Sequence, residues 1–167
     1  KAFERFGHEE AGWLDAFALF VALKQKHGGT AWWDWPLEDR IYDAKTAETK
    51  SAALAEAVKL VQFQQFLFFQ QWRRLREYAH ANGIRLIGDM PIFIASDSAD
   101  VWSRPELFQL DKDRRPIFVA GVPPDYFSTA GQLWGNPLYE WKKHRETGYQ
   151  WWIDSFRTTL QMVDLVR

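Results

Sequence analysis

The stretch Ile84-Arg85-Leu86-Ile87-Gly88-Asp89 sets the fold class, and Gly83 and Pro91 bound it. It is short, apolar and β-branched, which is typical of a buried parallel strand that follows its helix. A second segment of this kind, residues 163–167 (Val-Asp-Leu-Val-Arg), follows a helical segment almost without a turn. The order helix, strand, insertion, helix, strand therefore predicts an α/β fold.

Helical patterns surround these two strands. One helix is predicted over residues 9–27, and strong helix formers fill residues 47–82. The second region exceeds an ordinary globular helix, so a break near Val58 is expected. Residues 140–161 are predicted to be helical, with apolar side chains at helical spacing that form a core stripe. That stripe comprises Tyr149, Trp152, Ile153, Phe156 and Leu160.

The insertion between the strands, residues 91–139, is too long for a simple loop and is predicted to be a subdomain. Asp97 or Ser98 is expected to cap a short helix. Residues 108–110 and 117–119 flank a polar turn and are predicted to pair as a hairpin.

The last part of the insertion, residues 120–139, combines loop-forming residues with polar and aromatic side chains. Pro123, Pro124 and Pro137 cannot donate to a ladder, so irregular structure is predicted over most of it. It is too apolar for a flexible linker and is expected to pack on a scaffold or hold a ligand. Sugars stack on aromatic faces and accept polar contacts, which makes this a candidate sugar-binding loop. The candidate residues are Asp125, Tyr126, Phe127, Gln132, Trp134 and Asn136.

Asp89 is a further candidate, because it ends the first strand, where barrel enzymes place groups that contact ligand. The same carboxylate could instead cap or pair with local backbone in the following turn. Trp32, Trp33 and Trp35 also allow two interpretations, since indoles pack in cores as readily as they line sugar sites.

Composition narrows the functional class. A chain of 167 residues suits one compact unit. A net charge of −1 gives no long-range attraction to nucleic acid or to an anionic membrane. No apolar run approaches the roughly 20 residues that span a bilayer. The absence of cysteine suits a reducing compartment, and the charged first residues show no signal peptide, so a cytoplasmic location is expected.

The standard nucleophile and cofactor motifs are absent from the sequence, which contains no G-x-S-x-G, H-E-x-x-H, P-loop or Rossmann glycine pattern. The four histidines show no ligand spacing, and the acids between 97 and 113 lack the alternation of a calcium loop. No metal site is therefore predicted. From the residues alone, a catalytic domain and a stand-alone carbohydrate-binding module both remain open.

Several motifs occur in one order along the chain. They are Trp32-Trp33-Asp34-Trp35-Pro36, Gly88-Asp89-Met90-Pro91-Ile92-Phe93, Asp97-Ser98-Ala99-Asp100-Val101-Trp102, Gly121-Val122-Pro123-Pro124-Asp125-Tyr126-Phe127, Gly131-Gln132-Leu133-Trp134-Gly135-Asn136-Pro137-Leu138-Tyr139 and Val163-Asp164-Leu165-Val166-Arg167. In wording and order the chain resembles the 4-alpha-glucanotransferases of the amylase-like group, also called amylomaltases or disproportionating enzymes. The resemblance covers most of the chain.

The resemblance implies a portion of a (β/α)8 TIM barrel. Residues 1–83 would be a helical part leading into the barrel, 84–90 a barrel strand, 91–139 an inserted substrate-loop subdomain, and 140–167 a barrel helix with the following strand. A barrel cut there leaves an open sheet edge and bare apolar faces, so self-association of the 167-residue chain is expected.

The resemblance also implies an activity, the transfer of α-1,4-glucan segments between maltooligosaccharides without a cofactor. Retaining transfer needs a nucleophilic carboxylate and an acid/base carboxyl roughly 5 Å apart. The resemblance places Asp89 beside the active-site pocket, makes loop 120–139 a cover for the substrate, and makes Arg167 the arginine that supports the nucleophile. Both catalytic carboxylates would lie beyond Arg167, so the chain alone is expected to be inactive. An amylase-type hydrolase and a non-catalytic binding or interaction module are the alternatives.

Overall fold

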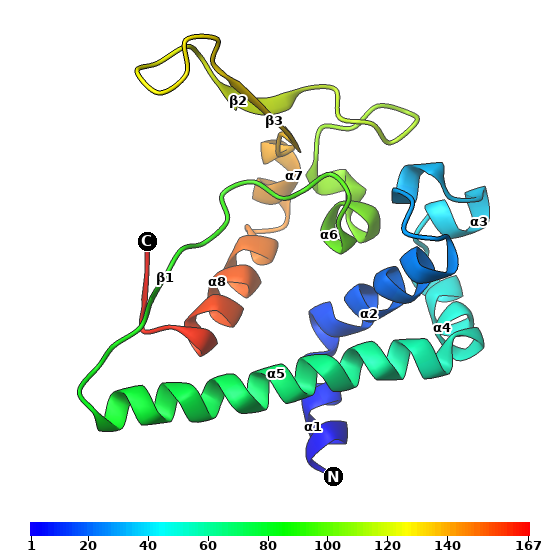
Figure 1. Ribbon diagram of the computed structural model, residues 1–167. Helices are drawn as coiled ribbons and strands as arrows, with labels where there is room; N and C mark the ends of the chain where they lie inside the picture. Colours follow the sequence, from blue (N-terminus) through cyan, green and yellow to red (C-terminus); the bar gives the residue numbers. More distant parts are fainter.

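The computed structural model describes residues 1–167, except for the side chain of Ala44. Helices make up most of it, and strands occur at two places (Figure 1). The helical elements are α1 (Ala2–Glu9), α2 (Ala11–Lys26), η1 (Trp32–Asp34), α3 (Leu37–Arg40), α4 (Ala44–Ala53), α5 (Ala55–Ala81), α6 (Ala99–Ser103), η2 (Pro105–Leu107), α7 (Trp141–Glu146) and α8 (Gln150–Met162). The strands are β1 (Ile87–Gly88), β2 (Val119–Val122), β3 (Gln132–Pro137) and β4 (Leu165–Val166).

The two short strands β1 and β4 pair in parallel, with Ile87 opposite Leu165 and Gly88 opposite Val166. This confirms the parallel pair that the apolar segments predict. The strands β2 and β3 pair antiparallel and project from the molecule as a hairpin at the top of Figure 1. The long helix α5 runs along the opposite side of the molecule, and α2 packs across it.

The core lies where α2, α6 and the segment around η1 meet. Trp32 and Trp102 are fully buried there, and Trp35 is 3% exposed. The alternatives that the sequence left open for the tryptophans are thereby resolved for Trp32 and Trp35, which pack inward. Ser98, one of the two residues predicted as the cap, caps α6 by accepting a hydrogen bond from the Val101 N–H.

Three helix predictions need correction. The predicted helix 9–27 begins at Ala11, and the separate helix α1 precedes it. The break in 47–82 exists but falls at Leu54, because Val58 and Val61 both face the core and require an unbroken turn between them. Residues 140–161 are two helices, since Gly148 and Tyr149 adopt the left-handed conformation between them.

The burial predictions for the first strand and for much of the last helix are also wrong for this chain. Ile87 is 68% exposed, and Ile153, Phe156 and Leu160 of the expected core stripe are between 43% and 47% exposed. Periodicity identified an apolar face correctly but assumed that a partner covers it. Trp152 of the same stripe is partly buried against the core, as predicted, and Trp151, outside the stripe, is the buried residue of this helix.

The loop 120–139 is more regular than predicted. Its prolines do not interrupt the ladder, because Pro123 and Pro124 follow β2 and Pro137 is the last residue of β3. The hairpin predicted from 108–110 and 117–119 is reduced to a single bridge between Leu110 and Pro116. No helix of the described chain is long and apolar enough to cross a membrane.

Candidate functional site

Asp89 and Arg167 stand together at the ends of the parallel strands, because each directly follows its strand. Arg167 Nε and Nη2 donate to the two carboxylate oxygens of Asp89, both at 2.9 Å. The pairing is bidentate, which fixes the plane of the guanidinium as well as its position. The side chain of Arg167 is 82% exposed and that of Asp89 66% exposed, so the pair remains open to a ligand.

The tip of the β2–β3 hairpin is shaped by Asp125. Its Oδ1 accepts the backbone N–H groups of Phe127 at 2.9 Å and Ser128 at 2.8 Å. Gly131 is required where the tip rejoins β3, since a Cβ there would lie 2.6 Å from the carbonyl oxygen of Val122. The tip is therefore a defined turn and not a loose loop.

The base of the hairpin is tied to the segment that follows β1. Asn136 Nδ2 donates to the Ile94 carbonyl at 3.0 Å, and Ser96 Oγ donates to the Gly135 carbonyl at 2.8 Å. Tyr139 adds a third tie, because its hydroxyl donates to the Ile92 carbonyl at 2.8 Å. The hairpin is thus anchored to the same segment that carries Asp89.

The aromatic side chains of the hairpin differ in their surroundings. Tyr126 and Phe127 are 96% and 89% exposed and contact each other edge to face. Trp134 is half exposed; its Nε1 donates to Gln132 Oε1 at 2.9 Å and its ring lies beside Phe93. Tyr126 and Phe127 thus present two large apolar surfaces to solvent on a fixed turn.

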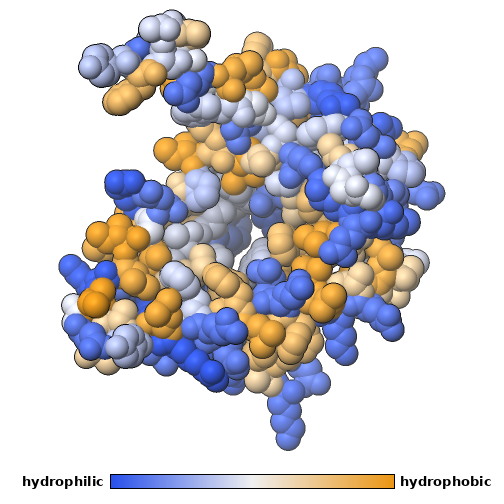
Figure 2. Space-filling model, viewed as in Figure 1, coloured by the Kyte–Doolittle hydropathy of each residue, from blue (hydrophilic) through white to orange (hydrophobic). Residues whose placement is uncertain are grey.

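The molecular surface is hollowed beneath this hairpin. Figure 2 shows the recess between the projecting tip and the body below it, on the side where Figure 1 places β1 and the C-terminus. An aromatic overhang above a recess with a charged pair can take a neutral, polar ligand that also stacks on aromatic rings. Sugars have this chemistry.

Comparison with known proteins gives the family. The family described as 4-alpha-glucanotransferase matches residues 1–167. The chain belongs to this family.

The similar proteins extend the match over the whole chain. The 4-alpha-glucanotransferase of Thermus thermophilus is 52% identical over 167 residues, which are 100% of this chain and 33% of that protein. The chloroplastic/amyloplastic 4-alpha-glucanotransferase of Solanum tuberosum is 37% identical over 157 residues, 94% of this chain and 27% of that protein. The structure of Streptococcus agalactiae amylomaltase in complex with acarbose superposes with a TM-score of 0.91 at 40% identity, covering 99% of this chain and 33% of the other.

This glucanotransferase-family chain spans about one third of the length of its relatives. The cytoplasmic location stays a prediction, since two relatives, from Oryza sativa and Solanum tuberosum, are named chloroplastic/amyloplastic.

The site residues predicted for this 4-alpha-glucanotransferase-family chain fall into three groups. Asp125, Gln132 and Asn136 use polar atoms to shape or anchor the hairpin. Tyr126, Phe127 and Trp134 expose their rings. Asp89 and Arg167 form the charged pair at the strand ends.

Sequence reasoning missed the contact between Asp89 and Arg167, because nothing in a single sequence gives strand register. It also missed the hydrogen bond from Ser96 to Gly135, because Gly135 lies in β3, a strand that the prolines had led us to predict as irregular.

Two buried polar groups of the family member lie away from the hairpin tip. His144 is fully buried, with Nε2 3.2 Å from the Leu107 carbonyl, and burial lowers the pKa of its imidazole. Burial raises the pKa of Asp39, but hydrogen bonds from Lys26 and His27 and the charges of Lys26 and Lys50 outweigh burial and lower it overall. Both residues stabilise the fold, and neither is among the predicted site residues.

Other candidate sites are weaker. A cavity of about 410 Å³ lies between α2, α6 and α8, and none of the predicted site residues lines it. Among the described residues, no group of three or more His, Cys, Asp or Glu side chains could hold a metal ion.

Proposed function

We propose that this chain is the substrate-loop portion of a 4-alpha-glucanotransferase that transfers α-1,4-glucan segments between maltooligosaccharides by retaining double displacement. The observation that carries the proposal is the exposed pair Tyr126 and Phe127 on a hydrogen-bonded turn, in a chain 52% identical to a named 4-alpha-glucanotransferase over its whole length. Two large aromatic rings that are exposed on a defined turn contribute little to the stability of the fold, but they are well placed to stack on a ligand.

The hairpin would act by covering the acceptor side of the bound glucan. Rings of Tyr126 and Phe127 would stack on apolar sugar faces, while Trp134 would extend this surface toward the body. Closing that side excludes water, which favours a sugar hydroxyl over water as the acceptor. Asp125 and Asn136 would contribute by holding the hairpin in shape, as their hydrogen bonds indicate.

The charged pair would act at the floor of the recess. The guanidinium of Arg167 is permanently charged, because the hydrogen bond and the charge of Asp89 raise the already high pKa of Arg167. Such a cation can stabilise a neighbouring nucleophilic carboxylate in its ionised form. In this proposal the nucleophile and the acid/base residue are not among the residues of this chain.

The proposal places the chain within a (β/α)8 barrel. Exposed Ile87 on β1 and exposed Ile153 and Phe156 on α8 would be covered by neighbouring strands and helices of such a barrel. The same bare faces would promote self-association of the 167-residue chain expressed alone.

The test uses a polypeptide of the relatives' length that contains this chain, referred to as the complete enzyme. Incubation with maltotriose should convert two molecules of maltotriose into glucose and maltopentaose. The 167-residue chain alone should produce neither sugar above a buffer blank. Formation of glucose and maltose without any sugar longer than maltotriose would indicate a hydrolase. Binding of maltotriose without any product would indicate a binding module.

A further inference from the structure

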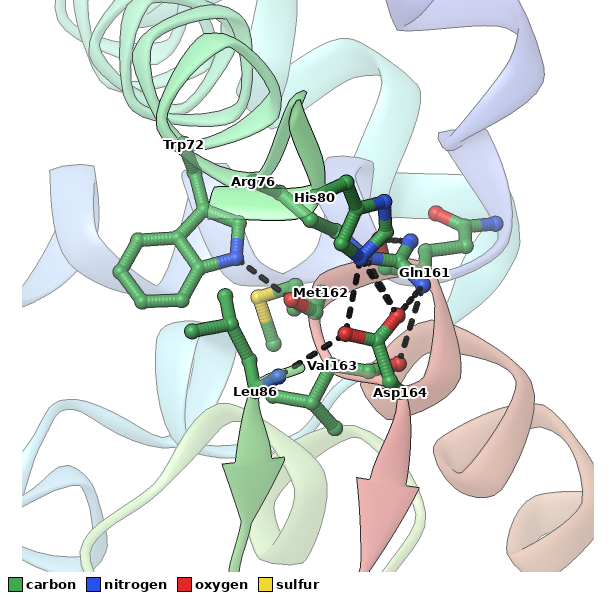
Figure 3. A network of polar contacts seen from close by, with 8 residues as sticks. All are labelled: Trp72, Arg76, His80, Leu86, Gln161, Met162, Val163 and Asp164. Carbon is green, nitrogen blue, oxygen red and sulfur yellow. Dashed lines mark hydrogen bonds and ion pairs between the residues drawn. The ribbon is translucent and has the colours of Figure 1, made fainter. Parts of the chain in front are cut away.

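Three side chains of α5, those of Trp72, Arg76 and His80, contact the junction between α8 and β4 (Figure 3). Trp72, Arg76 and His80 recur every four residues and therefore lie on one face of the helix. Trp72 Nε1 donates to the Met162 carbonyl at 2.7 Å, and Arg76 Nη1 donates to the Gln161 carbonyl at 2.9 Å. These bonds occupy carbonyl groups at the C-terminal end of α8, where the helix has no partners of its own.

Asp164 is the centre of this network. Its carboxylate accepts the backbone N–H of Leu86 at 2.9 Å, Arg76 Nε at 3.1 Å, and lies 2.8 Å from His80 Nε2. The side chain is 13% exposed. The N–H of Leu86, then Arg76 and His80, hold the pKa of the Asp164 carboxyl well below its usual range. Asp164 is therefore ionised and joins α5, the start of β1 and the start of β4.

The network determines which residues of the two strands stand opposite each other. Asp164 N–H and Leu165 N–H both donate to the Leu86 carbonyl, at 2.9 and 3.2 Å. The ladder then runs through the pairs Ile87–Leu165 and Gly88–Val166. The next residues in this register are Asp89 and Arg167.

A register error would separate the charged pair. Side chains alternate between the two faces of a strand, so a slip by one residue would turn Arg167 away from Asp89. The two-residue strands β1 and β4 have few backbone bonds to resist such a slip. The carboxylate of Asp164 adds a bond to the backbone of Leu86, directly before β1, and contacts with two side chains of α5.

We propose that Asp164 is a positioning residue of the transfer reaction, which acts by fixing the β1–β4 register so that Arg167 is held beside Asp89 at the recess. The proposal rests on the proposed function for its kinetic consequence, but not for its structural one. Asp164 itself touches no substrate.

The kinetic test compares Asp164→Asn, Arg167→Lys and the double variant in the complete enzyme, with maltotriose as substrate. Asp164→Asn keeps the side-chain volume and should lower kcat about tenfold while KM changes little, since misplacement of a reacting group chiefly affects the chemical step. In the Arg167→Lys background the same substitution should lower kcat by no more than about twofold, because both act through one group. An undiminished tenfold loss in that background would overturn the proposal.

A matched control separates positioning from general stability. Asp39 is also a carboxylate held by cationic side chains, Lys26 at 2.9 Å and Lys50 at 3.5 Å, but it lies away from the strands. Asp39→Asn should leave kcat per folded molecule within about twofold even where it lowers the melting temperature. An equal loss of kcat in both variants would reduce Asp164 to a structural role.

The structural test is independent of activity. If Asp164→Asn does not fold, His80→Gln removes one partner of the same carboxylate and leaves Arg76 and Leu86 in place. A crystal structure of either variant should show loss of the two 2.9 Å contacts between Arg167 and Asp89. An unchanged Arg167–Asp89 pair would overturn the inference. If instead the complete enzyme binds maltotriose but forms no sugar longer than maltotriose, the proposed function alone would be overturned.

Discussion

The two aromatic regions of this molecule use the same residue types in opposite ways. In the core around Trp32, Trp35 and Trp102, every ring is enclosed and each indole N–H donates to a backbone carbonyl, at 2.8, 3.0 and 3.0 Å. At the hairpin tip, Tyr126 and Phe127 touch little but each other. In the core, packing and a hydrogen bond hold each ring in place. At the tip, hydrogen bonds hold the backbone turn, while the rings themselves are exposed. We infer that the first region supplies stability and the second supplies binding.

The largest effect is expected in the core, for Trp102→Ala. The ring packs against Phe20, Trp35 and Tyr42, so its loss leaves a cavity and an unpaired Asp39 carbonyl. The free energy of unfolding of the complete enzyme should fall by about 3–5 kcal/mol, measured by denaturant titration. A fall below about 1 kcal/mol would mean that the core does not depend on this cluster.

The hairpin tip should show the reverse pattern. The double variant Tyr126→Ala, Phe127→Ala should change the free energy of unfolding by less than about 0.5 kcal/mol, because both rings are exposed. Transfer from maltotriose should lose about 1–2 kcal/mol of transition-state binding, a roughly five- to thirtyfold fall in kcat/KM. Unchanged transfer would remove these rings from the substrate site.

Trp134 lies between the two regions and sharpens the comparison. Its ring is half exposed yet packs beside Phe93, which in turn stacks on buried Tyr139. Trp134→Ala should weaken transfer more than it lowers stability, with a stability loss of about 1 kcal/mol. A steep drop in melting temperature with unchanged transfer per folded molecule would place this indole in the core group.

The smallest effect is expected from His144, which lies where the hairpin joins α7 and packs edge to face on Tyr139. Burial lowers the pKa of this imidazole in the folded protein, so the unfolded chain binds the proton more readily. Its contribution to stability should be complete above the unfolded pKa of about 6.5 and decline as the pH falls through that value toward the lower folded pKa.

Denaturant titrations between about pH 7.5 and pH 5 measure this dependence. His144→Gln should flatten the acid decline relative to the unmodified protein; His8→Gln, which replaces an exposed histidine in the last turn of α1, is the matched control. An identical pH slope in all three proteins would show that His144 does not couple folding to protonation.

The sequence predicted the features that local chemistry determines. The parallel strands, the Ser98 cap and the break between α4 and α5 follow from apolar runs, capping residues and helix length. Contacts between distant segments were beyond it. Nothing in the sequence pairs Arg76 with Asp164, because only the folded chain brings α5 next to the residue that precedes β4.

Burial was the other limit of sequence reasoning. The spacing of Ile153, Phe156 and Leu160 defines an apolar helix face, but spacing does not reveal whether another element covers that face. In the hairpin, prolines that exclude donors from a ladder lie at or beyond the strand ends, where no donor is needed. The candidate site was therefore predicted by residue type, while its division into shaping and exposed residues required the structure.

The most direct test of this division is a crystal structure of the complete enzyme with a bound maltooligosaccharide. The account predicts sugar rings against the faces of Tyr126 and Phe127, within the recess that Asp89 and Arg167 border, and no sugar contact by Trp32, Trp35 or Trp102. A glucan bound elsewhere, with the hairpin rings free in solvent, would contradict it.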